Sequence, residues 1–145
     1  LAERHPGTVP ADPDELAAGL DLTLHRAFDC CGSDFDRAVD TAIELGFDRV
    51  LTSGGENTAL EGLAALERIF AKAGTRITIM PGSGVSADNV STIATRLPVR
   101  EIHASCSTAF PVSAAAENRL GFATEHARQT DAVKVRALKA ALAAV

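Results

Sequence analysis

The sequence predicts an α/β fold in which strands and helices alternate along the chain and the strands form a parallel sheet. Four apolar segments rich in β-branched residues recur, at residues 20–25, 48–52, 76–80 and 99–104. Their starts lie 28, 28 and 23 residues apart, close to the roughly 30 residues of one strand, loop and crossover helix. Each segment is followed by a loop containing Gly, Ser or Asp and then by a helical pattern. We therefore expect four successive strand–helix units in a single domain.

Apolar periodicity and capping residues predict the first two helices. Five apolar residues at the spacing i, i+3, i+4, i+7 and i+8 mark the first, namely Phe35, Ala38, Val39, Ala42 and Ile43. Ser33 with Asp36 gives a start like a capping box, and Gly46 predicts the end of this helix. The second helix starts at a similar pair, Thr58–Glu61, and stops before Gly74.

The last two helices are predicted in the same way, with a less regular stretch between them. Ser86 is the expected N-cap of the third helix, and Pro98 ends it. The fourth helix is expected at about 130–144, with Val135, Leu138 and Leu142 facing inward. For residues 106–124 we expect a long loop with a short helical turn at 114–118.

Composition and charge exclude several classes of protein. The chain has 145 residues and a formal net charge of −5, whereas binding to nucleic acid backbones depends on clustered Lys and Arg. No apolar run approaches the roughly 20 residues needed to span a bilayer, and the N-terminus lacks the pattern of a signal peptide. We therefore expect a cytoplasmic protein that binds neither nucleic acid nor membranes, with residues 1–13 as an irregular lead-in.

Polar residues follow each of the four predicted strands, in the segments 25–29, 52–55, 81–84 and 103–106. In a parallel array the carboxyl ends of the strands meet at one edge, where ligands bind. Side-chain alternation places one set of residues on a common face of the sheet: Thr23, His25, Thr78, Met80, Glu101, His103 and Ser105. We therefore expect one wet or ligand-lined face and a single site at its edge.

Several of these polar side chains suit acid–base chemistry. His25 and His103 are candidate catalytic residues, because a neutral imidazole can act as a general base or a metal ligand near neutral pH; each could equally be bonded to a neighbouring backbone group or carboxylate. Asp29 is the third catalytic candidate, to orient an imidazole or accept a proton. Arg26 could clamp a carboxylate or phosphate. The alternative for Arg26 and Asp29 is a simple surface ion pair.

Two glycine-containing loops are candidate anion sites. Gly82 and Gly84, with Ser83 between them and Ser86 after them, could aim backbone N–H groups at an anion, and Ser53 with Gly54 forms a weaker instance. Tight turns that require positive φ explain the same glycines without a ligand.

The three cysteines are odd in number, and two of them are adjacent, which fits free thiols in a reducing compartment. Cys30, Cys31 and Cys106 are candidate metal ligands, since thiolates suit Cu(I) or Zn. Their spacing matches no known metal motif, and small buried cysteines are common.

Four ordered motifs in this chain resemble the CutC family, whose members are named for copper homeostasis. They are residues 24–29 (LHRAFD), 50–55 (VLTSGG) after Leu45 and Gly46, 79–85 (IMPGSGV) with Asn89, and 101–105 (EIHAS). The strand-end residues that match the family pattern are His25, Arg26, Asp29, Ser53, Gly54, Gly82, Gly84, His103 and Ser105. The cysteines offered as copper ligands in the family lie mainly in its first half, so the three cysteines here match none of them.

The resemblance implies a TIM-type (β/α)8 barrel of about 250 residues, of which this chain would hold strands five to eight. We therefore expect a half-barrel that is incomplete on its N-terminal side. Its open edges and interior predict a homo-oligomer.

Three functional hypotheses follow. The first is a CutC-like protein of copper homeostasis that binds copper, the second an enzyme that acts on a small anionic or phosphorylated metabolite by His acid–base chemistry. The third is a noncatalytic half-barrel remnant.

Overall fold

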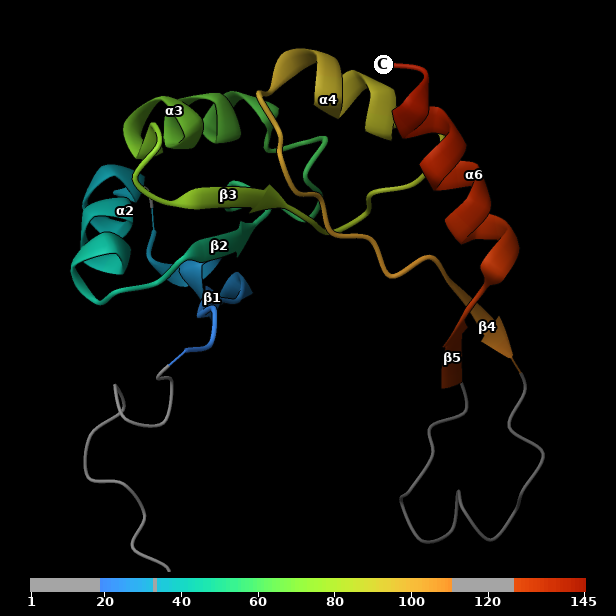
Figure 1. Ribbon diagram of the computed structural model, residues 1–145, viewed down its shortest axis with the longest axis horizontal. Helices are drawn as coiled ribbons and strands as arrows, with labels where there is room; N and C mark the ends of the chain where they lie inside the picture. The colour runs from blue at the N-terminus through green and yellow to red at the C-terminus, as the bar shows by residue number, and fades with distance from the viewer. Residues whose placement is uncertain (1–18, 33, 111–126) are drawn as a thin grey trace, which may run out of the picture.

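The computed structural model describes residues 19–32, 34–110 and 127–145 (Figure 1). Strands and helices alternate along most of this part of the chain. The elements, in order, are β1 (Thr23–Leu24), the 3-10 helix η1 (Arg26–Cys30), α2 (Phe35–Glu44), β2 (Arg49–Thr52), α3 (Leu63–Ala73), β3 (Thr78–Pro81), α4 (Val90–Arg96), β4 (Ser107–Phe110), β5 (Ala127–Thr130) and α6 (Ala132–Ala143).

The first three predicted strands form a parallel sheet in the order β1-β2-β3. Leu24 pairs with Val50, and Val50 pairs with Ile79. The strand predicted at 99–104 was wrong: residues 101–106 have no regular secondary structure. A single backbone bond, from His103 N to Pro81 O (2.9 Å), holds this segment beside β3. One bond is too few to make a strand, because a strand is defined by a ladder of such bonds.

The segment after residue 106 contains a β-ladder where the sequence predicted a loop. β4 and β5 pair antiparallel, with Thr108 opposite Gln129. The prediction was therefore wrong for residues 107–110. The helical turn expected at 114–118 and the lead-in at 1–13 lie outside the described residues.

The four predicted helices are present, with some shifted starts. The side chain of Asp34 caps α2 by accepting from Arg37 N (3.2 Å), and Ser33 lies outside the described residues. The Thr58–Glu61 capping box forms, through bonds of 3.1 and 3.2 Å, but it precedes the regular α3 helix by one turn.

The starts of the last two helices also differ from the sequence prediction. The regular helix α4 begins at Val90 with Asn89 as its N-cap. Ser86 instead caps the turn before it, because Ser86 Oγ accepts from Asp88 N (3.3 Å) and Ser86 N donates to the Asn89 side chain (2.9 Å). In α6 the N-cap is Asp131, whose carboxylate accepts from Val133 N (2.8 Å).

Helices α2, α3 and α4 lie on one side of the sheet, and α6 packs against α4 (Figure 1). Side chains that alternate along β2 and β3 confirm the expected division of faces: Val50 and Ile79 are buried under the helices, whereas Thr78 and Met80 on the opposite face are half-buried. The face that carries Thr78 and Met80 is therefore the one left open for polar groups.

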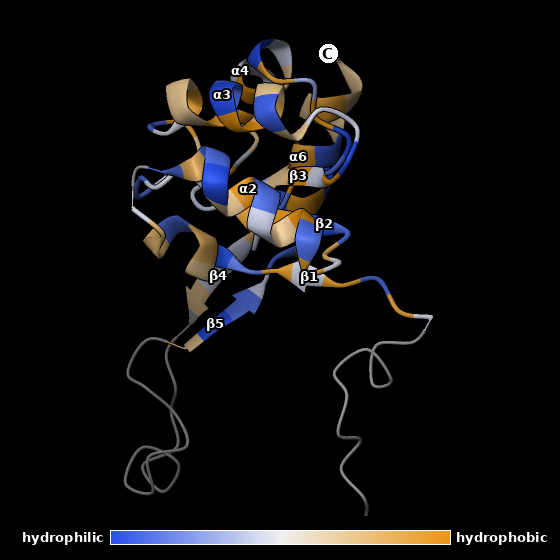
Figure 2. Ribbon diagram, turned by 90° about the vertical axis from the view of Figure 1, so that its left-hand side faces the viewer, coloured by the Kyte–Doolittle hydropathy of each residue, from blue (hydrophilic) through white to orange (hydrophobic). Residues whose placement is uncertain are grey.

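The separate two-stranded sheet contains β5, which Figure 2 shows to be largely hydrophilic.

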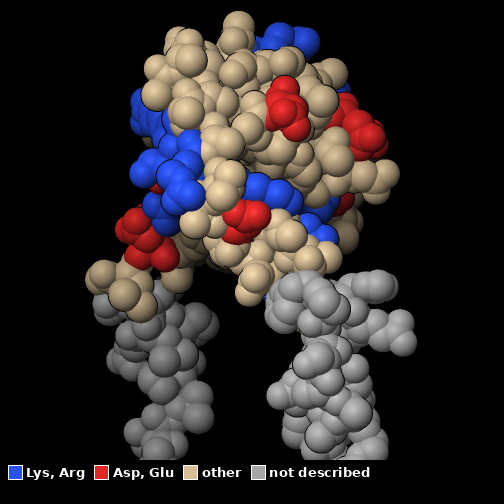
Figure 3. Space-filling view, turned by 90° about the vertical axis from the view of Figure 1, so that its right-hand side faces the viewer, with Lys and Arg blue, Asp and Glu red and all other residues tan. Residues whose placement is uncertain are grey.

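Among the described residues, none of the helices combines the length and hydropathy required to cross a bilayer. Lys and Arg side chains gather in several patches on the face that includes α6, with Asp and Glu side chains between them (Figure 3).

Candidate functional site

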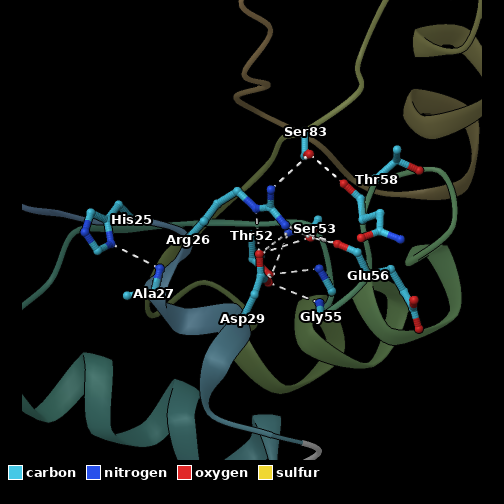
Figure 4. A network of polar contacts seen from close by, with 12 residues as sticks. His25, Arg26, Ala27, Asp29, Thr52, Ser53, Gly55, Glu56, Thr58 and Ser83 are labelled. Atoms are coloured by element: carbon cyan, nitrogen blue, oxygen red, sulfur yellow. Dashed lines mark hydrogen bonds and ion pairs between the residues drawn. The ribbon is translucent and has the colours of Figure 1, made fainter. Parts of the chain in front are cut away.

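Arg26 connects the loops that follow the three parallel strands (Figure 4). It lies at the start of η1, directly after β1, and its Nε donates to the Asp29 carboxylate (2.8 Å). Its Nη2 donates to Ser53 Oγ (2.7 Å) after β2, and its Nη1 donates to Ser83 Oγ (3.0 Å) after β3. A further bond runs from Nη2 to the carbonyl of Glu56 (3.1 Å). Four of the five N–H groups of this guanidinium therefore have protein acceptors.

Asp29 is the acceptor at the centre of this network, and its side chain is only 8% exposed. Its carboxylate accepts bonds from Thr52 Oγ1, Ser53 N and Gly55 N as well as from Arg26. Burial raises the pKa of Asp29, but the hydrogen bonds from Thr52, Arg26, Ser53 and Gly55 outweigh it and leave the pKa below its usual value. Asp29 is therefore held as a carboxylate, and the ion pair with Arg26 weighed from the sequence is present.

The two histidines lie apart from this network. His25 is exposed and caps η1, with its Nδ1 accepting from Ala27 N (3.1 Å). Figure 4 shows its ring pointing away from Asp29. His103 is also exposed, and its side chain lies over Gly82 beyond β3. His25 thus follows β1 at one lateral edge of the three-stranded sheet, and His103 lies beside β3 at the other edge. The catalytic roles predicted for them and for Asp29 stay predictions.

Packing accounts for the glycines of both candidate anion loops. Gly54 and Gly84 have positive φ angles of 74° and 68°. A Cβ on Gly54 would lie 2.7 Å from the Gly62 carbonyl oxygen, and one on Gly84 would lie 2.7 Å from Thr58 Cγ2. At Gly82 a Cβ would lie 2.5 Å from the Leu51 side chain. The positive φ angles support the tight-turn interpretation for Gly54 and Gly84, whereas close packing alone accounts for Gly82. Anion binding by these loops stays a prediction.

An ion pair on the open face of the sheet was missed by the sequence analysis. Arg49 on β2 donates to both oxygens of Glu101 (2.8 and 3.2 Å) and to Asp21 (3.1 Å). Hydrogen bonds with Glu101 and Asp21 raise the pKa of Arg49. The alternation of side chains along the strands could have indicated this ion pair, because Arg49 and Glu101 both occupy positions that face away from the helices.

The cysteines do not gather into a metal centre in the described structure. Cys30 and Cys31 are exposed at the end of η1, and Cys106 is half-buried. The described part of the chain contains no group of three or more His, Cys, Asp or Glu residues that could hold a metal ion. Ser105, the remaining candidate, lies beside Ser107, with their Oγ atoms 3.1 Å apart.

Comparison with known proteins places this arrangement in a family. The model of the CutC family matches residues 13–108. A CutC family protein of Sinorhizobium medicae is 49% identical over 129 residues, which is 89% of this chain and 52% of that protein. A CutC family protein of Rhizobium meliloti is 48% identical over 126 residues, covering 87% of this chain and 51% of that protein.

A solved structure agrees with these sequence matches. The crystal structure of a CutC protein from Streptococcus agalactiae, which is named for copper homeostasis, superimposes with a TM-score of 0.55 at 33% identity. The match covers 59% of this chain and 42% of that protein. The chain spans about half the length of the curated relatives it matches. The family match over most of its length, together with these relatives, shows that the chain belongs to the CutC family.

Proposed function

We propose that this chain takes part in copper homeostasis, the role for which the Streptococcus agalactiae protein is named. The observation that carries the proposal is the family match over residues 13–108. It includes the Arg26, Asp29 and Ser53 network, so the resemblance extends to the carboxyl edge of the sheet, where α/β proteins place their ligands.

Copper would be a transient cargo of this chain, held by Cys30 and Cys31. Both thiols are exposed and adjacent at the end of η1, and thiolates are the ligands that Cu(I) prefers. Thiolates that are not held in a preorganised site must lose conformational entropy when they bind a metal. We therefore expect weak Cu(I) binding that allows rapid loading and release.

The complete architecture belongs to the same proposal. The parallel order β1-β2-β3, with α2, α3 and α4 on one side, supports a TIM-type barrel to which this chain contributes the second half. In this barrel β1, β2 and β3 would be strands five to seven, and the 101–106 segment would lie at the place of the eighth. The three free thiols support a working place in the reducing cytoplasm.

Competition for Cu(I) under reducing, anaerobic conditions tests the copper role. The chain is expected to retain Cu(I) against weak chelators and to lose it to a strong one. Cys30→Ser combined with Cys31→Ser should abolish retention, because it removes both exposed thiols.

Cys106→Ser serves as the matched control, since it removes the half-buried thiol and should leave retention unchanged. Failure of the wild-type chain to retain Cu(I) against even weak chelators would contradict the copper-binding proposal. Retention that depends on Cys106 alone would contradict the assignment to Cys30 and Cys31. Stoichiometric retention against the strong chelator would contradict weak binding.

A further inference from the structure

A hollow of about 480 Å³ lies beyond the Arg26 network, at the carboxyl edge of the sheet. It is lined by residues 84–88 after β3, residues 105–107, Arg128 of β5, and Lys134 and Ala137 of α6. This volume lies within the range of sites for small molecules. We propose that the hollow binds a small molecule through a phosphate group, independently of any copper role.

The backbone at Cys106 shapes one wall of the hollow. Cys106 has a φ of 45°, which is uncommon for a residue with a side chain. It lies where the segment beside β3 turns into β4, and Ser105 Oγ and Ser107 Oγ come within 3.1 Å of each other. Cys106 O accepts from Asp131 N (2.8 Å), which fixes this turn to the start of α6. Two hydroxyl groups are thus presented side by side in the wall.

Two cationic side chains converge on the same wall. Lys134 Nζ donates to the Ser107 carbonyl oxygen (2.9 Å), and Arg128 Nη2 donates to the same oxygen (3.1 Å). Arg128 Nε also donates to Ser107 Oγ (2.9 Å). The ammonium and the guanidinium are therefore close neighbours, and two like charges in proximity favour an anion between or beside them.

Neither of these cations is neutralised by a carboxylate within ion-pair distance among the residues that the structure describes. Arg26, Arg49, Lys72, Arg76 and Arg96 each have such a partner. Arg128 and Lys134 also keep N–H groups beyond those bonded to Ser107, because a guanidinium carries five and an ammonium three. The lining itself holds two cations and one carboxylate, that of the exposed Asp88. The Asp131 carboxylate, which does not line the hollow, accepts from Thr108 Oγ1 and Val133 N and also interacts electrostatically with Lys134.

This combination of groups matches the chemistry of a phosphate group. A guanidinium and an ammonium supply charge-assisted bonds to phosphate oxygens. One O–H of the Ser105–Ser107 pair is used in their mutual hydrogen bond, so the pair supplies one further donor. The hollow is much larger than a phosphate ion alone, so we assign it to a phosphorylated small molecule. The position at the carboxyl edge agrees with the general placement of ligands in parallel α/β sheets.

Titration of the ¹⁵N-labelled chain with inorganic phosphate and with glycerol phosphate tests this assignment by NMR. Saturable shifts are expected at the N–H groups of residues 84–86 and 105–107, with glycerol phosphate binding more tightly than inorganic phosphate. Shifts that do not saturate, or that centre elsewhere, would overturn the proposal. Equal affinity for the two probes would overturn the assignment to a phosphorylated molecule.

Matched variants separate the site from the general field of the protein. Lys134→Gln and Arg128→Gln should each weaken phosphate binding roughly tenfold, the loss expected for one charged hydrogen bond. Lys139→Gln and Arg136→Gln remove the same charge from exposed positions of α6 that do not line the hollow, and should change affinity by less than about twofold, as expected for a screened exposed charge. Similar losses in both pairs would overturn the assignment. If Arg128→Gln unfolds the chain, the Lys134→Gln comparison and the wild-type shifts still decide it.

Discussion

Ser53 is held in place from two directions, by polar partners and by a close backbone contact. Its side chain is fully buried and accepts from Arg26 Nη2, while its carbonyl group lies against Gly62. A Cβ placed on Gly62 would lie 1.8 Å from Ser53 O, a distance that no rotamer change relieves. Glycine is therefore required at position 62 because the Ser53 carbonyl approaches so closely, although the φ of −82° at this position suits any residue.

Gly62→Ala is expected to destabilise the chain by about 3 kcal/mol or more, because backbone must move to admit the methyl group. Gly46→Ala is the matched control. Gly46 ends α2 with a φ of 77° and the bond from Phe47 N to Ala42 O that is typical of a left-handed C-terminal glycine. Nothing lies within 4 Å of its Cβ position, so its cost is limited to the roughly 1 kcal/mol of backbone strain. Urea unfolding of both variants measures the difference. Equal costs would show that the Ser53 contact relaxes freely.

Asp29 makes the stability of the network depend on pH. Its pKa in the folded chain lies below the usual value because of its hydrogen bonds, so its contribution is present above pH about 4 and is lost as pH falls through the folded pKa. At neutral pH, Asp29→Asn should cost about 1–3 kcal/mol, since an amide N–H₂ would face donors instead of accepting from them.

Unfolding measured from pH 7 down to pH 3 checks this prediction. The wild-type chain should lose stability more steeply than Asp29→Asn below pH about 4, since the variant has no carboxylate at this position. Asp36→Asn is the control, because Asp36 lies exposed in the first turn of α2 outside the network. Parallel pH profiles for wild type and Asp29→Asn would contradict the role of Asp29.

At the scale of elements, the sequence predicted best those features that arise from nearby residues. The apolar spacing within 35–43 and the Thr58–Glu61 box are local, and both α2 and the box are present. β4 and β5 escaped prediction because their pairing joins residues such as Ser107 and Thr130 across a long interval, and the ARQT sequence of β5 has no apolar alternation.

The opposite error occurred at 99–104, where the composition is typical of a strand. Ile102 and Ala104 pack partly against the α4 and α6 cluster as a strand's inner face would. Of the backbone groups in this segment, however, only His103 N bonds to β3. A strand also requires backbone hydrogen-bond partners on a neighbouring strand, and composition does not specify them.

The candidate site shows the same difference between local contacts, which the sequence predicted, and long-range contacts, which it did not. The pairing of Arg26 with Asp29 spans three residues and was open to prediction. The bond from Arg26 to Ser83 spans 57 residues and depends on how the loops after β1 and β3 come together. Arg128 and Lys134 escaped notice for the same reason, since both meet Ser107 through contacts that span more than 20 residues.

At the scale of the whole molecule, the sheet has two incompletely paired sides in the described structure. β1 pairs with β2 alone, and the 101–106 segment bonds to β3 through one residue. Beside β1 lies a second hollow of about 480 Å³, whose apolar lining includes Leu24, Phe28, Leu45 and Phe47. Leu45 is 64% exposed. An open sheet edge next to exposed apolar groups favours association.

We propose that two copies of this chain associate about a two-fold axis, with the β1 side of each protomer meeting the 101–106 side of its partner. This arrangement joins two open sheets into a closed barrel, removes both edges and covers the apolar part of the hollow. Cys31 also lines this hollow, so the copper proposal requires Cys31 to stay accessible at the rim of the interface. Light scattering at micromolar concentration should then give the mass of two chains, and the temperature of thermal unfolding should rise with protein concentration.

Leu45→Asp should produce single chains, because it places a charge in the covered hollow. Val133→Asp, at an equally exposed apolar position on α6 (65% exposed), should leave the pair intact. A monodisperse single chain whose unfolding is independent of concentration would contradict the paired barrel, and equal dissociation by both variants would place the interface elsewhere.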